Sequence, residues 1–293
     1  MTRRLFLAAA TTLCSAAPSK STMSVEGYIF QQYAQSLKQP LEAVIPKALD
    51  MVRAAGFRNI ELNAFFLPSG RAQTLSLIRS HGLRMTSLYV GGSMHEADKA
   101  DQTISRALEF GDVCRPFGCE AIVTNPDPKP NDVPKTDTEL AVQAESLNRM
   151  GRRLAGNGFQ LRAHHHTPQL ANNAREWRHI LQNTDAEYVH ICVDSDWAYE
   201  GGFEPISFLR EVGNRLEEIH VRSARNKLWL EDLEDSDIDY RRVAEYLREQ
   251  ALNPLIVVEL AYRSNTVVTR SLEEDLRLSR LYAEKVFRVR ADE

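Results

Sequence analysis

The sequence has few cysteines, no excess of basic residues and no glycine-rich nucleotide motif. Four cysteines among 293 residues are too few for a disulfide-stabilised scaffold. Lysine and arginine total 36 against 40 acidic residues, so the net charge of −4 argues against DNA or RNA as a main partner. No P-loop occurs, and no Gly-x-Gly-x-x-Gly follows the first predicted strand. Hydrophobic residues make up 43% of the chain, which is enough for a sizeable core.

The first 22 residues are typical of an export signal. Arg3 and Arg4 precede an uncharged apolar stretch over 5–13, and small residues follow at 15–17. The stretch is shorter than the roughly 20 residues that span a bilayer. The order TRRLFL at 2–7 resembles a twin-arginine signal. We therefore expect residues 1–22 to direct export to the periplasm, with no membrane span after the signal. The alternative is an unstructured basic start on a cytoplasmic protein.

The remaining residues, 23–293, alternate β-rich runs with amphipathic segments and show no linker. Glycines at 56, 82, 118 and 158 follow predicted helices, where a left-handed cap belongs. Eight repeats of strand and helix in about 270 residues predict an α/β fold, a single (β/α)8 TIM barrel. A doubly wound open sheet is the rival, but its nucleotide-binding signature is missing. We expect strands at 28–33, 58–63, 84–90, 119–125, 159–166, 188–194, 216–222 and 255–260. We expect helices near 40–55, 70–81, 97–117, 136–157, 170–183, 204–214, 239–251 and 272–287.

Polar residues end the last four predicted strands, at the barrel face where active sites of this fold lie. The fifth strand ends in three histidines, and alternation places His164 and His166 on one face and His165 on the other. The sixth ends at Asp194, the seventh contains His220 and Arg222, and the eighth places Glu259 after an apolar run.

These side chains together favour a divalent metal site. A buried carboxylate is costly unless it meets a cation or a metal. Mixed oxygen and nitrogen ligands suit Mn²⁺, Mg²⁺, Co²⁺ or Zn²⁺. The alternatives are a structural network of ion pairs and histidines that are hydrogen-bonded in the core.

Several short motifs, weak alone but ordered along the chain, resemble the xylose isomerase-like TIM-barrel superfamily. That superfamily contains sugar isomerases and epimerases, inosose dehydratase and endonuclease IV, and the resemblance covers about residues 27–288. The motifs are IELN at 60–63, TNPDP at 124–128, LRAHHHTPQ at 161–169, CVDSDWAYEGG at 192–202, EEIHVRS at 217–223, DSDIDY at 235–240 and VVELAY at 257–262.

The resemblance implies a divalent metal held by His164, Asp194, His220 and Glu259, and Mn²⁺ is the expected ion. The last three of these residues match the family pattern. His164 departs from the sugar epimerases, which have glutamate there. An inosose-dehydratase-like branch has His-Asn-His at this point, and its last histidine matches His166.

The resemblance also implies proton abstraction beside a sugar carbonyl or hydroxyl that the metal polarises. Glu259 is the expected base, and His166 is the expected second acid or base because imidazole titrates near neutrality. The same site supports isomerisation, epimerisation or dehydration, so the predicted enzyme is a sugar isomerase or epimerase, with a lyase as the alternative.

A small-molecule sugar, keto-sugar or polyol is the expected partner, and a homo-oligomer is compatible with the sequence. Arg222 is a candidate to bind substrate oxygens, with a salt bridge to Glu61 or Glu231 as the alternative. Trp197, Trp229 and Tyr89 are candidates to stack on a sugar ring, with packing at the rim as the alternative. The remaining substrate-binding candidates are Glu61 and Asn125.

Two rival functions are compatible with a barrel of this kind. An endonuclease IV-like enzyme needs a trinuclear zinc cluster, and Glu61, His95 and Asn125 on the earlier strands offer too few ligands for it. A non-catalytic sugar-binding barrel stays open, because His164 departs from the epimerase pattern.

Overall fold

Eight parallel strands close into a barrel in this computed structural model, which describes residues 22–67 and 71–291. The spatial order of the strands is β1-β10-β7-β6-β5-β4-β3-β2, so the last strand pairs with the first. The predicted single (β/α)8 barrel is therefore confirmed. The barrel strands are β1 Met23–Glu26, β2 Asn59–Asn63, β3 Arg84–Tyr89, β4 Ala121–Thr124, β5 Gln160–Ala163, β6 Val189–Asp194, β7 Leu216–Val221 and β10 Leu255–Val258. A small hairpin, β8 Ala224–Arg225 and β9 Leu228–Trp229, follows β7.

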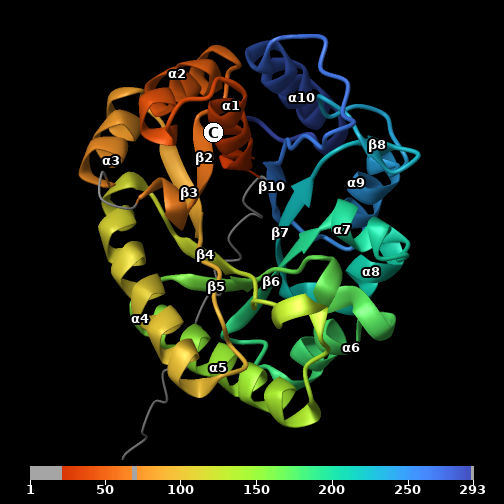
Figure 1. The fold of residues 1–293 in the computed structure, drawn as a ribbon. Coiled ribbons are helices and arrows are strands. Elements are labelled where there is room, and N and C mark those ends of the chain that lie inside the picture. The colour runs from red at the N-terminus through yellow and green to blue at the C-terminus, as the bar shows by residue number, and fades with distance from the viewer. Residues whose placement is uncertain (1–21, 68–70, 292–293) are drawn as a thin grey trace, which may run out of the picture.

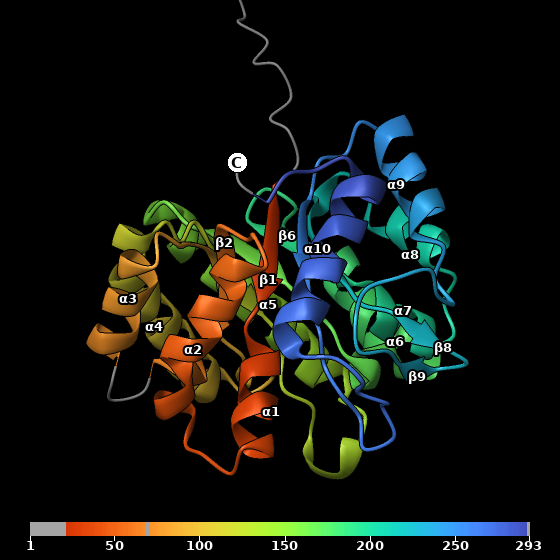
Figure 2. The same cartoon turned by 90° about the horizontal axis from the view of Figure 1, so that it is seen from above.

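Helices surround the barrel as an outer ring, as Figure 1 shows. The α-helices are α1 Tyr28–Ser36, α2 Leu41–Ala54, α3 Arg71–Ser80, α4 Ala97–Cys114, α5 Asp137–Gly156, α6 Thr167–Asn183, α7 Ser195–Glu200, α8 Pro205–Val212, α9 Tyr240–Glu249 and α10 Leu272–Phe287. Short 3₁₀ turns occupy Ala64–Phe66, Arg115–Phe117, Pro130–Asp132 and Gly213–Arg215. Figure 2 shows α1 directly beyond β1, at the end of the barrel toward which the strands point.

The prediction of the first strand is wrong. The segment 28–33 belongs to α1, and the strand that closes the barrel is β1, at 23–26. Ile29, Phe30 and Ala34 are the buried residues of α1, a helical spacing that aromatic and β-branched content obscured. The four residues of β1 are too few to show a periodicity. The other predicted strands correspond to β2 to β7 and β10, with ends that shift by a few residues.

The four predicted glycine caps are confirmed, since each glycine has a positive φ between 62° and 98°. The predicted signal at 1–22 lies outside the described residues except for Thr22, which forms a bridge to Arg290. Cys114, Cys119 and Cys192 are free thiols, and all three are buried. Among the residues that the structure describes, no helix combines the length and the apolar character needed to cross a membrane.

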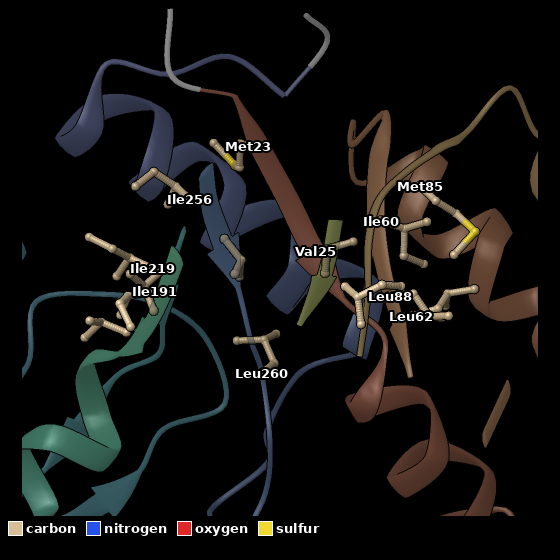
Figure 3. Packing of buried hydrophobic residues seen from close by; sticks show 14 of the residues in the cluster. Met23, Val25, Ile60, Leu62, Met85, Leu88, Ile191, Ile219, Ile256 and Leu260 are labelled. Carbon is tan, nitrogen blue, oxygen red and sulfur yellow. The ribbon is translucent and has the colours of Figure 1, made fainter. Parts of the chain in front are cut away.

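The apolar core includes strand side chains that alternate with polar ones. Figure 3 shows Val25, Ile60 and Ile256 among the apolar side chains that pack beside β1 and its neighbours. The alternate positions carry polar groups that meet across the barrel: Glu61 of β2, Arg162 of β5 and Glu218 of β7 are all buried. Because β2 and β7 are not neighbours, contacts between their side chains run through the barrel interior.

The packing of α5 generates a test of the barrel's outer layer. A Cβ at Gly151 would lie 2.4 Å from the carbonyl oxygen of Tyr188, whereas a Cβ at Gly156 of the same helix would meet nothing within 4 Å. We expect Gly151→Ala to lower the free energy of unfolding by about 1–3 kcal/mol through overpacking. We expect Gly156→Ala to leave it unchanged or to raise it by up to about 1 kcal/mol. Urea unfolding followed by circular dichroism measures both, and equal midpoints for the two variants would contradict this packing.

Candidate functional site

Strand β7 and the residue after it place three charged side chains in line inside the barrel. Glu218, His220 and Arg222 alternate with Ile219 and Val221, so the three charged residues share one face. Arg222 follows the last residue of the strand, at the end where active sites of such barrels lie. The line therefore runs from the barrel interior to its mouth.

Glu218, the innermost of the three, is held ionised by an ion pair. Arg162 Nη1, from β5, lies 2.6 Å from Glu218 Oε2. Burial by itself would raise the pKa of Glu218, but the bond from His220 and the charge of Arg162 lower it to about 2. Glu218 is therefore a negatively charged acceptor directly beneath His220.

His220 contacts carboxylates with both of its ring nitrogens. Nδ1 lies 2.9 Å from Oε2 of Glu259, and Nε2 lies 2.9 Å from Oε1 of Glu218 and 3.1 Å from Oε1 of Glu61. Burial alone would lower the pKa of His220, but Cys192, Glu61 and Glu218 together raise it well above its ordinary value. The ring is thus fixed in orientation, with Nδ1 facing the mouth residue Glu259.

Arg222 joins the two acidic residues at the mouth. Its Nη2 lies 2.8 Å from Oδ2 of Asp194 and 2.6 Å from Oε1 of Glu259. Arg222 therefore does form salt bridges, as the alternative interpretation of the sequence had it, but with Asp194 and Glu259 in place of Glu61 or Glu231. The other oxygen of Asp194, Oδ1, accepts the backbone N–H groups of Asp196 and Trp197 at 2.9 Å and so begins helix α7.

These surroundings move the acidities of the two carboxyl groups in opposite directions. For Asp194, burial is the largest influence, and it raises the pKa to about 7 although Arg222 opposes it. For Glu259, burial also favours the neutral acid, but Arg222 and His220 outweigh it and hold the pKa far below its ordinary value.

The three consecutive histidines follow β5, which ends at Ala163 and not at His166 as predicted. His164 and His166 face the barrel mouth, and their ring centroids lie 4.9 Å apart. His165 points the other way, into the core between Trp177 and Phe208. The alternation expected from the sequence therefore persists beyond the end of the strand.

His164 is a buried imidazole without a hydrogen-bond partner on either nitrogen. Its Nε2 lies 3.9 Å from Oδ2 of Asp194, close but beyond a hydrogen bond. Burial lowers the pKa of His164 well below its ordinary value, and it lowers the pKa of His166 to about 4. Both rings are therefore neutral near pH 7 and offer lone pairs to a proton or a cation.

A cavity of about 500 Å³ opens above these residues. Its lining includes charged groups at the floor and aromatic rings toward the outside. The lining residues are Glu26, Tyr28, Asn63, Ala64, Phe65, Tyr89, Gly91, His164, His166, Trp197, His220, Arg222, Trp229 and Glu259. The volume is within the range that holds small organic ligands.

Two predicted substrate-binding residues do not line this cavity. Glu61 is fully buried below His220, where it accepts a hydrogen bond from the Ser87 hydroxyl. Asn125 is also buried, and its amide donates to the carbonyl oxygen of Pro126. Four other candidates from the sequence do line the cavity: Tyr89, Trp197, Arg222 and Trp229.

Sequence reasoning missed Glu26, the last residue of β1. Its side chain is 2% exposed, Oε2 accepts the backbone N–H of Tyr28 at 2.6 Å, and Oε1 has no partner. Burial, followed by the charges of Glu259 and Glu61, raises its pKa well above its ordinary value. Because the first strand was predicted at 28–33, Glu26 was not recognised as a residue at a strand end. An acidic residue directly before Gly27 could have indicated that a strand ends there.

Residues at the cavity floor and directly beside it fit a divalent metal. Asp194, His220 and Glu259 each offer a ligand atom, and these atoms lie within 4.8 Å of one another. His164 adds an unpartnered nitrogen near Asp194. The Glu218 carboxylate at Nε2 of His220 is the kind of outer contact that orients a metal-binding imidazole.

Charge balance points the same way. In the described network, the guanidinium groups of Arg162 and Arg222 and the His220 imidazole, whose pKa is raised, are outnumbered by five carboxyl groups. Without a further cation, protonation of some of these carboxyl groups relieves the excess of negative charge. The raised pKa values of Glu26, Glu61 and Asp194 match this. The carboxyl groups are those of Glu26, Glu61, Asp194, Glu218 and Glu259.

Known proteins resemble the chain in sequence and in fold. An inosose dehydratase of Geobacillus kaustophilus is 23% identical over 186 residues, which are 59% of this chain and 59% of that protein. The chain thus spans less than two thirds of the length of the first curated relatives that it matches.

The barrel also superposes on solved epimerases. A D-allulose 3-epimerase from Methylomonas sp. in complex with D-allulose gives a TM-score of 0.70 at 13% identity, with 92% of this chain and 99% of that chain covered. A 3-keto-D-glucoside 4-epimerase from E. coli gives a TM-score of 0.68 at 15% identity, with 91% and 100% covered. At these identities the likeness establishes the fold.

The family model of the xylose isomerase-like TIM barrel matches residues 49–282, most of the chain and all strands from β2 to β10. The chain therefore belongs to the xylose isomerase-like TIM barrel family.

Proposed function

We propose that this protein is a divalent-metal-dependent isomerase or epimerase of a sugar, keto-sugar or polyol. The observation that carries the proposal is the convergence of Asp194, His220 and Glu259, whose ligand atoms lie within 4.8 Å of one another; His220 and Glu259 line the cavity. Family membership and the epimerases among the structural neighbours support it.

In this proposal Asp194, His220 and Glu259 hold the metal, and His164 is the fourth candidate. Mn²⁺ is the first choice, with Mg²⁺, Co²⁺ and Zn²⁺ as alternatives for a mixed oxygen and nitrogen site. When bound, such an ion supplies Lewis-acid polarisation of a carbonyl, which acidifies the neighbouring C–H bond.

The protein's own groups move the proton. Glu259 is ionised, and it is the base expected from the sequence, but Arg222 and His220 already engage its two oxygens. His166 lines the cavity as a neutral ring that can accept a proton. Glu26 lines the same cavity with an unpartnered oxygen and a raised pKa, so it can donate one. The pKa of His166 is lowered and that of Glu26 is raised, so near pH 7 one group can accept a proton and the other can donate one.

The same arrangement favours dehydration as a second candidate function. A protonated Glu26 can pass its proton to a departing hydroxyl group, which is the step that a sugar or inosose dehydratase requires. The inosose dehydratases among the sequence relatives support this alternative.

The metal part of the proposal is tested by metal content. We expect protein purified with manganese to retain about one ion per chain by inductively coupled plasma mass spectrometry. Glu259→Gln should lose most of the bound ion, because it removes a charged ligand. Glu249→Gln, at an exposed position of α9, is the matched control and should bind the ion like the native protein. Native protein that stays metal-free after supplementation would rule out the metal site.

Glu26 is tested by proton exchange. With a panel of keto-sugars in deuterated water, nuclear magnetic resonance should detect exchange of the C–H beside the carbonyl by native protein. Glu26→Gln should slow that exchange or the product's formation by roughly 100-fold or more while it keeps its metal. If Glu26→Gln turns over like native protein, Glu26 takes no part in proton transfer.

We also propose that the protein is exported to the periplasm through residues 1–22. The basis is the arginine pair and the apolar stretch that follows it. Replacing Arg3 and Arg4 by lysine should keep the charge yet prevent recognition of a twin-arginine signal. Cell fractionation should then find the variant in the cytoplasm and the native chain in the periplasm. Equal distributions of the two chains would contradict export by this route.

A further inference from the structure

The outer part of the cavity has aromatic side chains that the proposed proton chemistry does not use. Tyr28 begins α1 and is 38% exposed, and Phe65 lies in the turn after β2 and is 41% exposed. Trp197 lines the cavity from α7, which follows β6. We call Tyr28, Phe65 and Trp197 the aromatic rim.

The strand order places members of the aromatic rim on opposite sides of the mouth. β2 and β6 lie four places apart in the closed order of eight strands, so Phe65 and Trp197 approach the cavity from opposite sides. Each of these two rings packs against a second aromatic ring. Phe65 stacks on Phe66 at 4.8 Å between centroids, and Trp197 packs edge-on against Trp229 at 5.4 Å.

Trp229 is itself fixed by polar contacts, which makes it a firm support for Trp197. Its indole N–H donates to Oδ2 of Asp196 at 2.8 Å. The guanidinium carbons of Arg222 and Arg263 lie 4.4 and 4.1 Å from its ring centroid. Partly exposed aromatic rings that line a cavity and pack against other rings are typical of a binding surface.

Charge at the mouth disfavours a phosphorylated ligand. Arg222 is the one lysine or arginine among the cavity-lining residues that the structure describes, and Asp194 and Glu259 neutralise it. Phosphate is usually held by free arginine or lysine side chains or by N–H groups at a helix start. Carboxylates already take N–H groups at two helix starts beside the cavity: Glu26 at α1 and Asp194 at α7.

We propose that the cavity takes an uncharged keto-sugar or polyol ring that carries an apolar aromatic substituent, a glycoside, rather than a sugar phosphate. The polar floor holds the ring, and the aromatic rim holds the substituent. That the ligand contains a sugar or polyol ring rests on the proposed function. The preference for an aromatic substituent depends only on the aromatic rim.

Equilibrium binding tests it without turnover. The full chain, purified with manganese, is titrated calorimetrically with methyl glycosides, phenyl glycosides and 6-phosphates of glucose and galactose. We expect at least one phenyl glycoside to bind about tenfold or more tightly than its methyl counterpart, because it buries a phenyl ring. We expect the 6-phosphates to bind more weakly than either glycoside.

Variants assign the preference to the rim. Phe65→Ala should bring the phenyl-to-methyl affinity ratio close to one. Leu37→Ala is the matched control, because Leu37 is equally exposed, at 42%, but lies outside the cavity, and it should keep the native ratio. Circular dichroism checks that both variants are folded.

Three results would overturn the inference: tighter binding of a 6-phosphate, equal affinity for phenyl and methyl glycosides, or no detectable binding of any phenyl glycoside. Failure of the proposed function is separately visible, as an absence of metal or of C–H exchange in a protein that still prefers phenyl glycosides.

Discussion

The excess of buried carboxyl groups inside the barrel is the constraint on which the site depends. Carboxylates from three strands or strand ends, Glu61, Glu218 and Glu259, surround His220 within 3.1 Å. Charges so far from water are costly unless they are paired, so the interior needs Arg162 below and Arg222 above the imidazole. The network thereby orders the mouth, because Arg222 fixes Asp194 and Glu259, and Asp194 in turn begins α7.

The same network explains why the functional residues fall where they do along the sequence. A parallel barrel strand alternates one side chain toward the helices and one toward the interior, and β7 places Ile219 and Val221 outward. The inward positions would normally carry bulky apolar residues that fill the barrel. Here they carry Glu218 and His220, so part of the core's apolar packing is exchanged for a polar interior that reaches the cavity.

Much of this arrangement was predictable from the sequence, because polar residues at the ends of apolar strands stand out. Asp194, His220 and Glu259 were found in this way. Glu26 was missed, because β1 has only four residues and its neighbour, α1, contains residues typical of strands. The salt-bridge partners suggested as an alternative for Arg222 differ from the observed ones, and Glu61 lies below the cavity. Contacts across a barrel depend on strand tilt and register, which a linear pattern does not encode.

The distribution of polarity within the cavity separates two tasks. Charged groups gather at the floor, where a proton can be moved in an environment shielded from water. Aromatic rings gather at the mouth, where contact with an apolar group adds binding energy without adding charge near the carboxylates. An anionic substituent would face the carboxylate of Glu259, and Arg222, the one guanidinium that lines the described part of the cavity, is already paired with Glu259 and Asp194. The electrostatics of the floor therefore constrain what the mouth can accept, and the aromatic rim is the surface that satisfies that constraint.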